Sequence, residues 1–345
     1  MRRLCPILVV CLAALASVAF AQQPSAAGPY KVLKTVKVGG DGGYDYVYAD
    51  DANRRLYIPR SGTAARITVF NLDTLQPVGE IPGVNAHGAA VDPKSNHGFG
   101  SSKPVAMWDS KTLATVKSID VQGAPDGILF DPFNERVWIF SHRAPNATVI
   151  NAVDGSVAGT LDLGGAPEQA VTDGAGRLYV DLEDKDSIAV VDANKLTVTA
   201  HYSLGGKGGG PGGLAFDAKN GILFAACHEP QTMVILNAAD GKIIATLPIG
   251  SGVDGAVFNP HTMEAFSSQG DGTLTVIKEN SPTSFAVEQT VQTMPHARTL
   301  TLDSATNQIV LIAADFTPPP PAPAGKRPGR GQIVPGSFSI LTVGK

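Results

Sequence analysis

Short runs of Val, Ile, Leu and Phe alternate along most of the chain with turns rich in Gly, Pro, Asp and Asn. In one stretch, an apolar run at 128–130 is followed by runs at 136–140, 148–150 and 157–163. Runs of this length, bounded by turn residues and lacking a helical period, predict β-strands. The pattern therefore predicts an all-β protein.

The four-strand unit repeats along the chain. Segments related to Pro125–Asp131 recur about every 42 residues, and an Asp or Asn opens a turn five residues after each equivalent of Asp126. The seven equivalent positions are Asp45, His87, Asp126, Glu168, Gly212, Asp254 and Arg298. Seven repeats of four antiparallel strands predict a seven-bladed β-propeller.

The two ends of the chain are expected to meet in the last blade. The seventh repeat stops at 337–343, which is only its third strand, and residues 32–38 have the pattern of an outer strand. We expect this N-terminal strand to complete the seventh blade, because closing the ring removes exposed sheet edges.

The first residues have the pattern of an export signal. Arg2 and Arg3 precede an apolar run at 7–20, and small residues allow cleavage after Ala21. We expect 1–21 to be a signal peptide and 22–345 to form a single propeller domain in the periplasm or outside the cell. No later segment has the length and apolarity of a membrane span.

A Pro-rich segment at 317–335 interrupts blade seven and carries Lys326, Arg327 and Arg330. It is either a tolerated surface insertion or a basic lid over the channel mouth.

Charge and cysteine content narrow the partners. The chain has 27 Lys and Arg against 31 Asp and Glu, a net charge of −4, and no basic cluster within the repeats. Nucleic acid is therefore not expected as the main partner.

Cys5 and Cys11 lie in the predicted signal peptide, so Cys227 is the one cysteine left and no internal disulfide is expected. We expect a monomer that binds a small molecule or an envelope protein.

The equivalent positions are expected to converge at one mouth of the central channel. Four carboxylates gathered there repel one another and favour a bound cation or a proton, although Arg298 neutralises part of the charge. The predicted ligand-binding residues are Asp45, Arg60, Asp126, His142, Glu183, His228, Asp254 and Arg298. A purely structural or water-binding role for the ring is the alternative.

A metal site at the mouth is predicted to use Asp45, His87, Asp254 and His296. Oxygen ligands alone suit Ca²⁺ or Mg²⁺, whereas an imidazole shifts the preference toward Mn²⁺, Zn²⁺ or Cu²⁺. The spacing does not choose between them, because each ligand comes from a different blade.

Catalysis at the mouth would use His87 or Glu168 as a general base and Arg298 to hold a substrate carboxylate. Cys227 and His228 also suggest a nucleophile and its base. Consecutive strand residues point to opposite faces, however, which favours a buried thiol.

The motifs as a whole resemble the YVTN/YncE-like β-propeller family, in an exported bacterial subgroup. The resemblance rests on the repeated Gly-x-Pro-x-Gly-apolar-x-apolar-Asp-Pro pattern and on the segments 42–46, 182–185, 252–254, 270–276, 297–299 and 335–338. It implies a propeller fold and export. Related propellers include lactonases and lyases, which implies an enzyme only by analogy. The function we expect is an exported propeller that binds a small ligand, a metal ion or a protein partner at the channel mouth. The alternatives are a metal-dependent hydrolase or lyase that uses the same polar ring, and a cell-envelope interaction scaffold. Where the subgroup usually has an acidic residue, this chain has Pro211-Gly212-Gly213.

Overall fold

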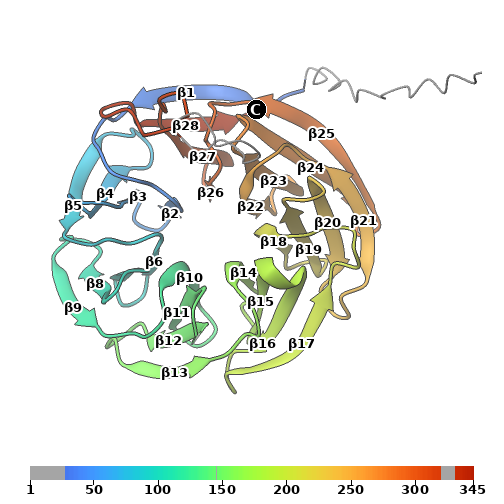
Figure 1. The fold of residues 1–345 in the computed structure, drawn as a ribbon, viewed down its shortest axis with the longest axis horizontal. Helices are drawn as coiled ribbons and strands as arrows, with labels where there is room; N and C mark the ends of the chain where they lie inside the picture. Colours follow the sequence, from blue (N-terminus) through green and yellow to red (C-terminus); the bar gives the residue numbers. More distant parts are fainter. Residues whose placement is uncertain (1–27, 145, 320–330) are drawn as a thin grey trace, which may run out of the picture.

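Seven four-stranded antiparallel sheets surround a central axis in the computed structural model of this chain (Figure 1). The structure describes residues 28–144, 146–319 and 331–345. The predicted fold class is confirmed: the chain is an all-β, seven-bladed propeller. The predicted signal peptide at 1–21 lies outside the described residues.

Each blade begins with its innermost strand and proceeds outward. Blade one contains β2 (Tyr48–Asp50), β3 (Arg55–Arg60), β4 (Arg66–Asn71) and β5 (Pro77–Pro82). Blade two contains β6 (Ala89–Asp92), β7 (His97–Gly100), β8 (Val105–Asp109) and β9 (Thr115–Ile119). Blade three contains β10 (Pro125–Asp131), β11 (Arg136–Ser141), β12 (Ala147–Asn151) and β13 (Val157–Leu161). Blade four contains β14 (Pro167–Thr172), β15 (Arg177–Leu182), β16 (Ser187–Asp192) and β17 (Thr197–Ser203).

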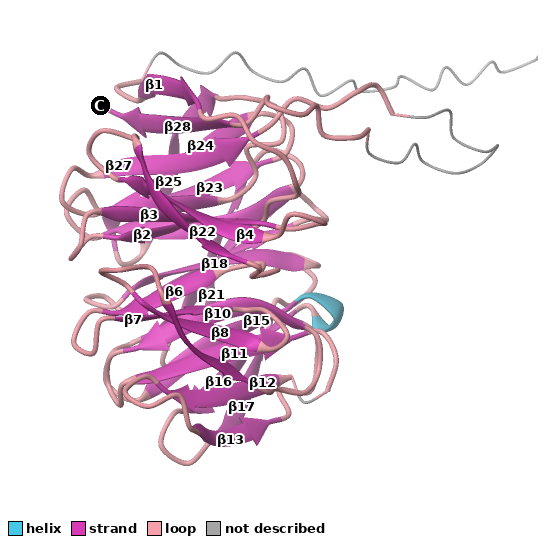
Figure 2. Cartoon of the chain, turned by 90° about the vertical axis from the view of Figure 1, so that its left-hand side faces the viewer, coloured by secondary structure: helices cyan, strands magenta, loops and turns pink. Residues whose placement is uncertain are grey.

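Blade five contains β18 (Pro211–Asp217), β19 (Ile222–Cys227), β20 (Thr232–Asn237) and β21 (Ile243–Pro248). Blade six contains β22 (Val253–Asn259), β23 (Glu264–Gln269), β24 (Thr273–Ser281) and β25 (Ser284–Gln292). Blade seven contains β26 (Leu300–Asp303), β27 (Gln308–Ala313), β28 (Ser339–Gly344) and β1 (Lys31–Lys37). The single described helical turn is a short 3-10 turn, η1 (Glu183–Lys185), which stands out at the edge of the side view (Figure 2).

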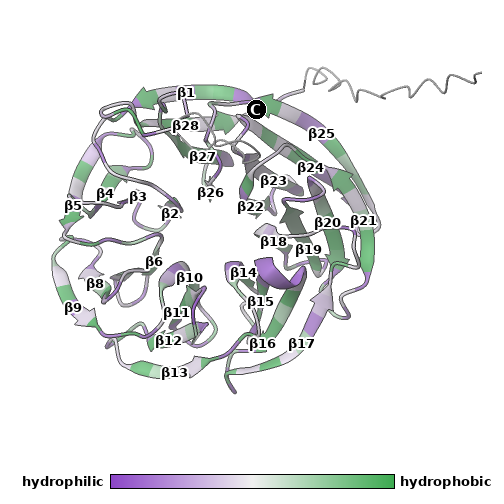
Figure 3. Cartoon of the chain, viewed as in Figure 1, coloured by the Kyte–Doolittle hydropathy of each residue, from purple (hydrophilic) through white to green (hydrophobic). Residues whose placement is uncertain are grey.

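The hydrophobic core lies between neighbouring blades. Between blades three and four, for example, Trp138 and Phe140 pack with Leu178 and Val180. The middle strands of a blade have neighbours on both faces, which explains why they are almost continuously apolar. Figure 3 shows this apolar content along the strands, whereas the η1 turn near the central opening is strongly polar.

The N-terminal strand closes the ring as predicted. β1 pairs antiparallel with β28, with Thr35 opposite Leu341. Val32 packs against the core between blades six and seven, and Val36 packs against the core between blades seven and one. The first strand therefore joins three blades, because its two inward-facing valines enter two different interfaces.

The innermost strands of blades four, five and six approach one another closely. The side-chain carbonyl of Gln169 accepts hydrogen bonds from the backbone N–H groups of Leu214 (3.0 Å) and Ala256 (2.9 Å), and its amide donates to the Ala256 carbonyl (2.9 Å). A Cβ on Gly213 would lie 2.7 Å from the carbonyl carbon of Gly255. Gly213, within β18, thus allows two backbones to meet, and one glutamine links three blades.

The Pro-rich insertion lies between β27 and β28, as expected. Its base is held by an antiparallel bridge between Phe316 and Ile333. Residues 320–330, including Lys326, Arg327 and Arg330, lie outside the described part of the chain, so the basic-lid hypothesis stays a prediction.

Closure can be tested at β1. Val32→Asp places a carboxylate against the apolar core between blades six and seven, and we expect it to lower the free energy of unfolding by about 1–3 kcal/mol. Thr35→Asp on the exposed face of the same strand should change it by less than about 0.5 kcal/mol. Urea unfolding of both variants measures the difference, and equal effects would show that β1 does not contribute an inward face.

Candidate functional site at the channel mouth

The equivalent positions of six blades bring charged side chains to the mouth of the channel. Asp126, Glu168 and Asp254 lie near the starts of β10, β14 and β22, whereas Asp45, His87 and Arg298 lie in the loops just before β2, β6 and β26. All of them are part of one chain of ion pairs. The repeat register therefore predicts which side chains meet.

The first half of this chain of ion pairs runs from blade six to blade two. Arg298 Nη1 lies 2.7 Å from Asp254 Oδ2, and Arg298 Nη2 lies 3.6 Å from Asp45 Oδ1. Asp45 Oδ2 in turn lies 2.9 Å from His87 Nδ1. Arg298 thus serves as the counter-charge of two carboxylates.

The second half continues from blade two to blade four. His87 Nδ1 lies 3.1 Å from Asp126 Oδ1, and His142 Nε2 lies 3.4 Å from Asp126 Oδ2 and 2.9 Å from Glu168 Oε1. The hydroxyl of Tyr46 donates a hydrogen bond to Glu168 Oε2 (3.0 Å). Acidic and basic groups alternate along the whole sequence of contacts, which offsets the repulsion among the four carboxylates.

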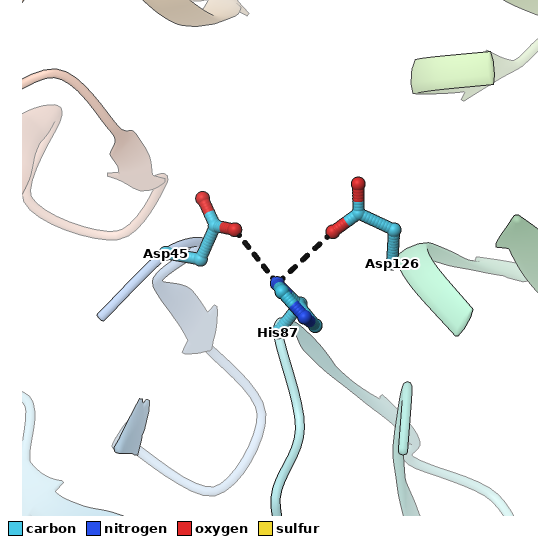
Figure 4. A group of neighbouring side chains, drawn as sticks. All are labelled: Asp45, His87 and Asp126. Atoms are coloured by element: carbon cyan, nitrogen blue, oxygen red, sulfur yellow. Dashed lines mark hydrogen bonds and ion pairs between the residues drawn. The ribbon is translucent and has the colours of Figure 1, made fainter. Parts of the chain in front are cut away.

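His87 occupies an unusual position between two carboxylates (Figure 4). Its Nδ1 is hydrogen-bonded to Asp45 and is also within ion-pair distance of Asp126. One ring nitrogen carries at most one hydrogen, so it cannot donate to both. Asp126 Oδ1 is buried and has no hydrogen-bond partner among the described residues. The site therefore has an acceptor without a donor at the place where three potential metal ligands converge.

The pKa values of Asp126, His87 and His142 are all raised, but for different reasons. Burial raises the pKa of Asp126 to about 6, although His87 partly offsets this effect. The hydrogen bond to Asp45 raises the pKa of His87, and the contact with Glu168 raises the pKa of His142 to about 9. At neutral pH the imidazole of His142 thus favours its protonated form and acts as a counter-ion of Glu168 and Asp126.

Blade five interrupts the ring. Gly212 contributes no side chain, and the imidazole of His228 takes up that space, because a Cβ on Gly212 would lie 2.9 Å from His228 Nε2. Glu183, in η1, lies on the side of His142, whose pKa its charge helps to raise. His228 and Glu183 therefore border the ring.

Arg60 and His296 are not members of the chain of ion pairs described above. The guanidinium of Arg60 stacks on Phe338 and donates to the Gly39 carbonyl (2.9 Å), and the ring of His296 packs on Phe316 with centroids 4.2 Å apart. The predicted metal set of Asp45, His87, Asp254 and His296 is not one of the groups with ligand spacing in the described part of the chain. Among the described residues, the groups with ligand spacing are Asp45–His87–Asp126 and Asp126–His142–Glu168.

The Cys227–His228 dyad is not supported. Cys227 is fully buried in the core between blades four and five, and burial raises the pKa of its thiol to about 12. A thiol of this kind is a weak nucleophile at neutral pH, in agreement with the buried-thiol interpretation.

Three residues near the mouth were not identified by the sequence pattern: Tyr46, Gln169 and Asp181. Asp181 is completely buried, accepts a hydrogen bond from the Gln169 backbone N–H (2.6 Å), and has a second oxygen without a hydrogen-bond partner among the described residues. Burial raises its pKa well above the ordinary value. The available signal was an Asp between Val180 and Leu182 in an otherwise apolar strand.

An apolar cavity of about 230 Å³ lies beneath the ring, inside the channel. Tyr46 and Glu168 line it together with Ala90, Leu129 and Leu300. The mouth therefore combines a charged rim with an apolar interior.

Comparison with known proteins supports the fold. No family model matches the chain, and no curated protein matches it. The RRP9 WD40 repeats are 10% identical with a TM-score of 0.71, over 93% of this chain and 100% of that one. A chain of the mitotic checkpoint complex is 12% identical with a TM-score of 0.68, over 89% and 95%. U3-55K is 10% identical with a TM-score of 0.67, over 91% and 98%.

The chain is a β-propeller with a WD40-like fold. At these identities the likeness shows the fold alone, so the function has to be argued from the site. The described part of the chain contains no helix long and apolar enough to cross a membrane.

The charge pairing can be tested by titrating His142. Because its pKa is raised from about 6.5 to about 9, its stabilising contribution is complete below pH 6.5 and is lost as the pH rises through about 9. In Glu168→Gln we expect the midpoint to fall toward the ordinary value, as followed by NMR of the imidazole C–H signals. Glu135→Gln, which removes a distant exposed carboxylate, should leave the midpoint unchanged. A wild-type midpoint at or below 6.5 would contradict the ion pair.

Proposed function

We propose that this protein is an exported propeller of the YVTN/YncE-like group that binds a divalent transition-metal ion at the channel mouth through Asp45, His87 and Asp126. The observation that carries the proposal is the buried Asp126 Oδ1, which lies 3.1 Å from His87 Nδ1 and has no hydrogen-bond donor among the residues that the structure describes. A cation in place of the His87 Nδ1 proton would bind both carboxylates and the imidazole at the same time.

The composition of the group supports a transition metal over Ca²⁺. Two carboxylates and one imidazole, with ligand atoms within 4.8 Å of one another, provide mixed oxygen and nitrogen ligands. Such ligands suit Zn²⁺ or Mn²⁺, whereas Ca²⁺ prefers a larger number of oxygens. His142 and Glu168 would then hold Asp126 from its other side and fix the orientation of its carboxylate.

Protons and the metal ion compete for this site. His87 has to lose its Nδ1 proton to bind a metal through that nitrogen. The hydrogen bond to Asp45 raises the pKa of His87 and so opposes this loss. The affinity for metal should therefore increase as the pH rises through the titration of His87. The charge of the ion would then offset the charges of Asp45 and Asp126.

Metal binding can be measured by calorimetry on protein stripped with a chelator. We expect one Zn²⁺ or Mn²⁺ per chain, and we expect His87→Ala and Asp126→Asn each to weaken binding by about tenfold or more. His97→Ala is the matched control, because His97 lies at the start of β7 and contacts the Ala152 carbonyl instead of the ring. Unchanged affinity in both ring variants, or Ca²⁺ binding that equals Zn²⁺ binding and persists in His87→Ala, would overturn the proposal.

Export is supported by the sequence at 1–21, where a basic start precedes an apolar run and small residues. We expect protein recovered from the periplasm or the medium to begin at Gln22, as measured by N-terminal sequencing. Recovery from the cytoplasm with Met1 retained would contradict export.

Protein binding at the rim is a second candidate function. It is favoured by the likeness to WD40 propellers, one of which is a component of a mitotic checkpoint complex.

The hydrolase or lyase alternative gains no support from the geometry. Its mechanism needs Arg298 to bind a substrate carboxylate, whereas Arg298 forms ion pairs with Asp254 and Asp45.

A further inference from the structure

We propose a second ligand site, outside the channel, that binds an amphipathic carboxylate such as a medium-chain fatty acid. The site is a cavity of about 460 Å³ between the closing strand β1 and blade one, on the side of the ring where β1 and β5 lie (Figure 1). Its size falls within the range of about 300–1,000 Å³ that is usual for small-molecule sites. We call it the closure pocket.

Arg60 lies in the charged end of the closure pocket. It is only 2% exposed, yet none of the described carboxylates forms an ion pair with it. Its Nη2 donates to the Gly39 carbonyl and its guanidinium stacks 3.2 Å from the centre of the Phe338 ring, while its Nε is buried without a hydrogen-bond partner in the described part of the chain. Burial lowers the pKa of Arg60 to about 10. A buried cation without a counter-ion is costly, so an anion here would be strongly favoured.

Arg66 supplies a second guanidinium at the same point. A Cβ on Gly40 would lie 2.9 Å from Arg60 Nη2 and 3.2 Å from Arg66 Nη2, so the two groups converge over one glycine. Arg66 contacts Asp41 (2.9 Å) and Glu80 (3.4 Å), which are 60% and 53% exposed. These two acids are exposed to solvent and pair with Arg66. The buried guanidinium of Arg60 is therefore left to bind a ligand carboxylate. Arginine is suited to this task because its fork of N–H groups matches two carboxylate oxygens.

Beyond the two arginines, the closure pocket is lined by apolar side chains together with the polar or charged Lys37, Thr68, Gln76 and Glu80. The apolar side chains are those of Val36, Val38, Val69, Phe70 and Leu75. A bare inorganic anion would satisfy the guanidinium but would leave these side chains without contacts, whereas a carboxylate with an alkyl chain uses both parts. The combination therefore indicates an amphipathic carboxylate.

A ligand in this position would bridge the first and last parts of the ring. The Val38 and Gly39 N–H groups donate to the Phe338 carbonyl, and the Gly336 N–H donates to the Gly40 carbonyl (2.8 Å). The charged end of the pocket is thus built on the segment that joins β1 to blade one. A ligand that binds only the closed ring raises its stability, so occupancy should stabilise the propeller against unfolding.

The test uses the whole protein with decanoate as the probe and decanol and inorganic phosphate as comparisons. We expect calorimetry to show one decanoate per chain, binding about tenfold or more tightly than either comparison, and the melting temperature to rise with decanoate. If decanol bound as tightly as decanoate, the claim that the arginines bind the carboxylate would be wrong. If phosphate bound as tightly as decanoate, the claim that the apolar side chains bind the alkyl chain would be wrong.

Variants locate the site. Arg60→Met keeps the length of the side chain, and Arg66→Gln changes a partly exposed one that the fold tolerates more readily. We expect each to weaken decanoate binding by about tenfold or more, whereas Arg177→Gln, at the start of β15 in blade four, should have no effect. If Arg60→Met does not fold, the test relies on Arg66→Gln alone. Decanoate binding to Arg66→Gln with wild-type affinity would overturn the proposal. Metal titration of the same variants should match the wild type, which separates this site from the ring.

Discussion

Radial convergence is the constraint on which this molecule depends. A ring of seven sheets places the residue before each innermost strand close to a shared axis, whatever its charge. In this chain four of those positions carry carboxylates, and the structure offsets their repulsion by alternating them with Arg298, His87 and His142. The last of these does not belong to the repeated position at all: it reaches inward from the loop after β11. Compensation by a neighbouring loop allows the acids to remain together.

The ring is asymmetric, and its asymmetry has a structural origin. Blades four to six are drawn together by Gln169, whose amide bonds to backbone groups of two other blades. Gly213 allows this approach, because a Cβ there would lie 2.7 Å from the carbonyl carbon of Gly255. At the repeated position blade five has Gly212, which supplies no side chain to the ring. The charged side chains of the ring therefore come from the other six blades.

The sequence predicted the number of blades, their strand order and the closure by β1, because these depend on period and turn chemistry. It also placed Asp45 beside His87, since neighbouring repeats bring equivalent residues together. It did not predict that Arg60, the last residue of β3, faces the blade junction and Phe338, or that His296 packs on Phe316. These outcomes depend on side-chain direction at loop ends. The contact of His142 with two carboxylates likewise depends on loop conformation, which no repeat specifies.

The pairing of β1 with β28 also governs the order of events during biosynthesis. β1 ends at Lys37, whereas its partner is not complete until Gly344 has been made. For nearly the whole of translation, the first strand therefore has no edge to join. Blade seven can be completed only after β28 has been made, and until then the valines at 32 and 36 of β1 have no blade to pack against.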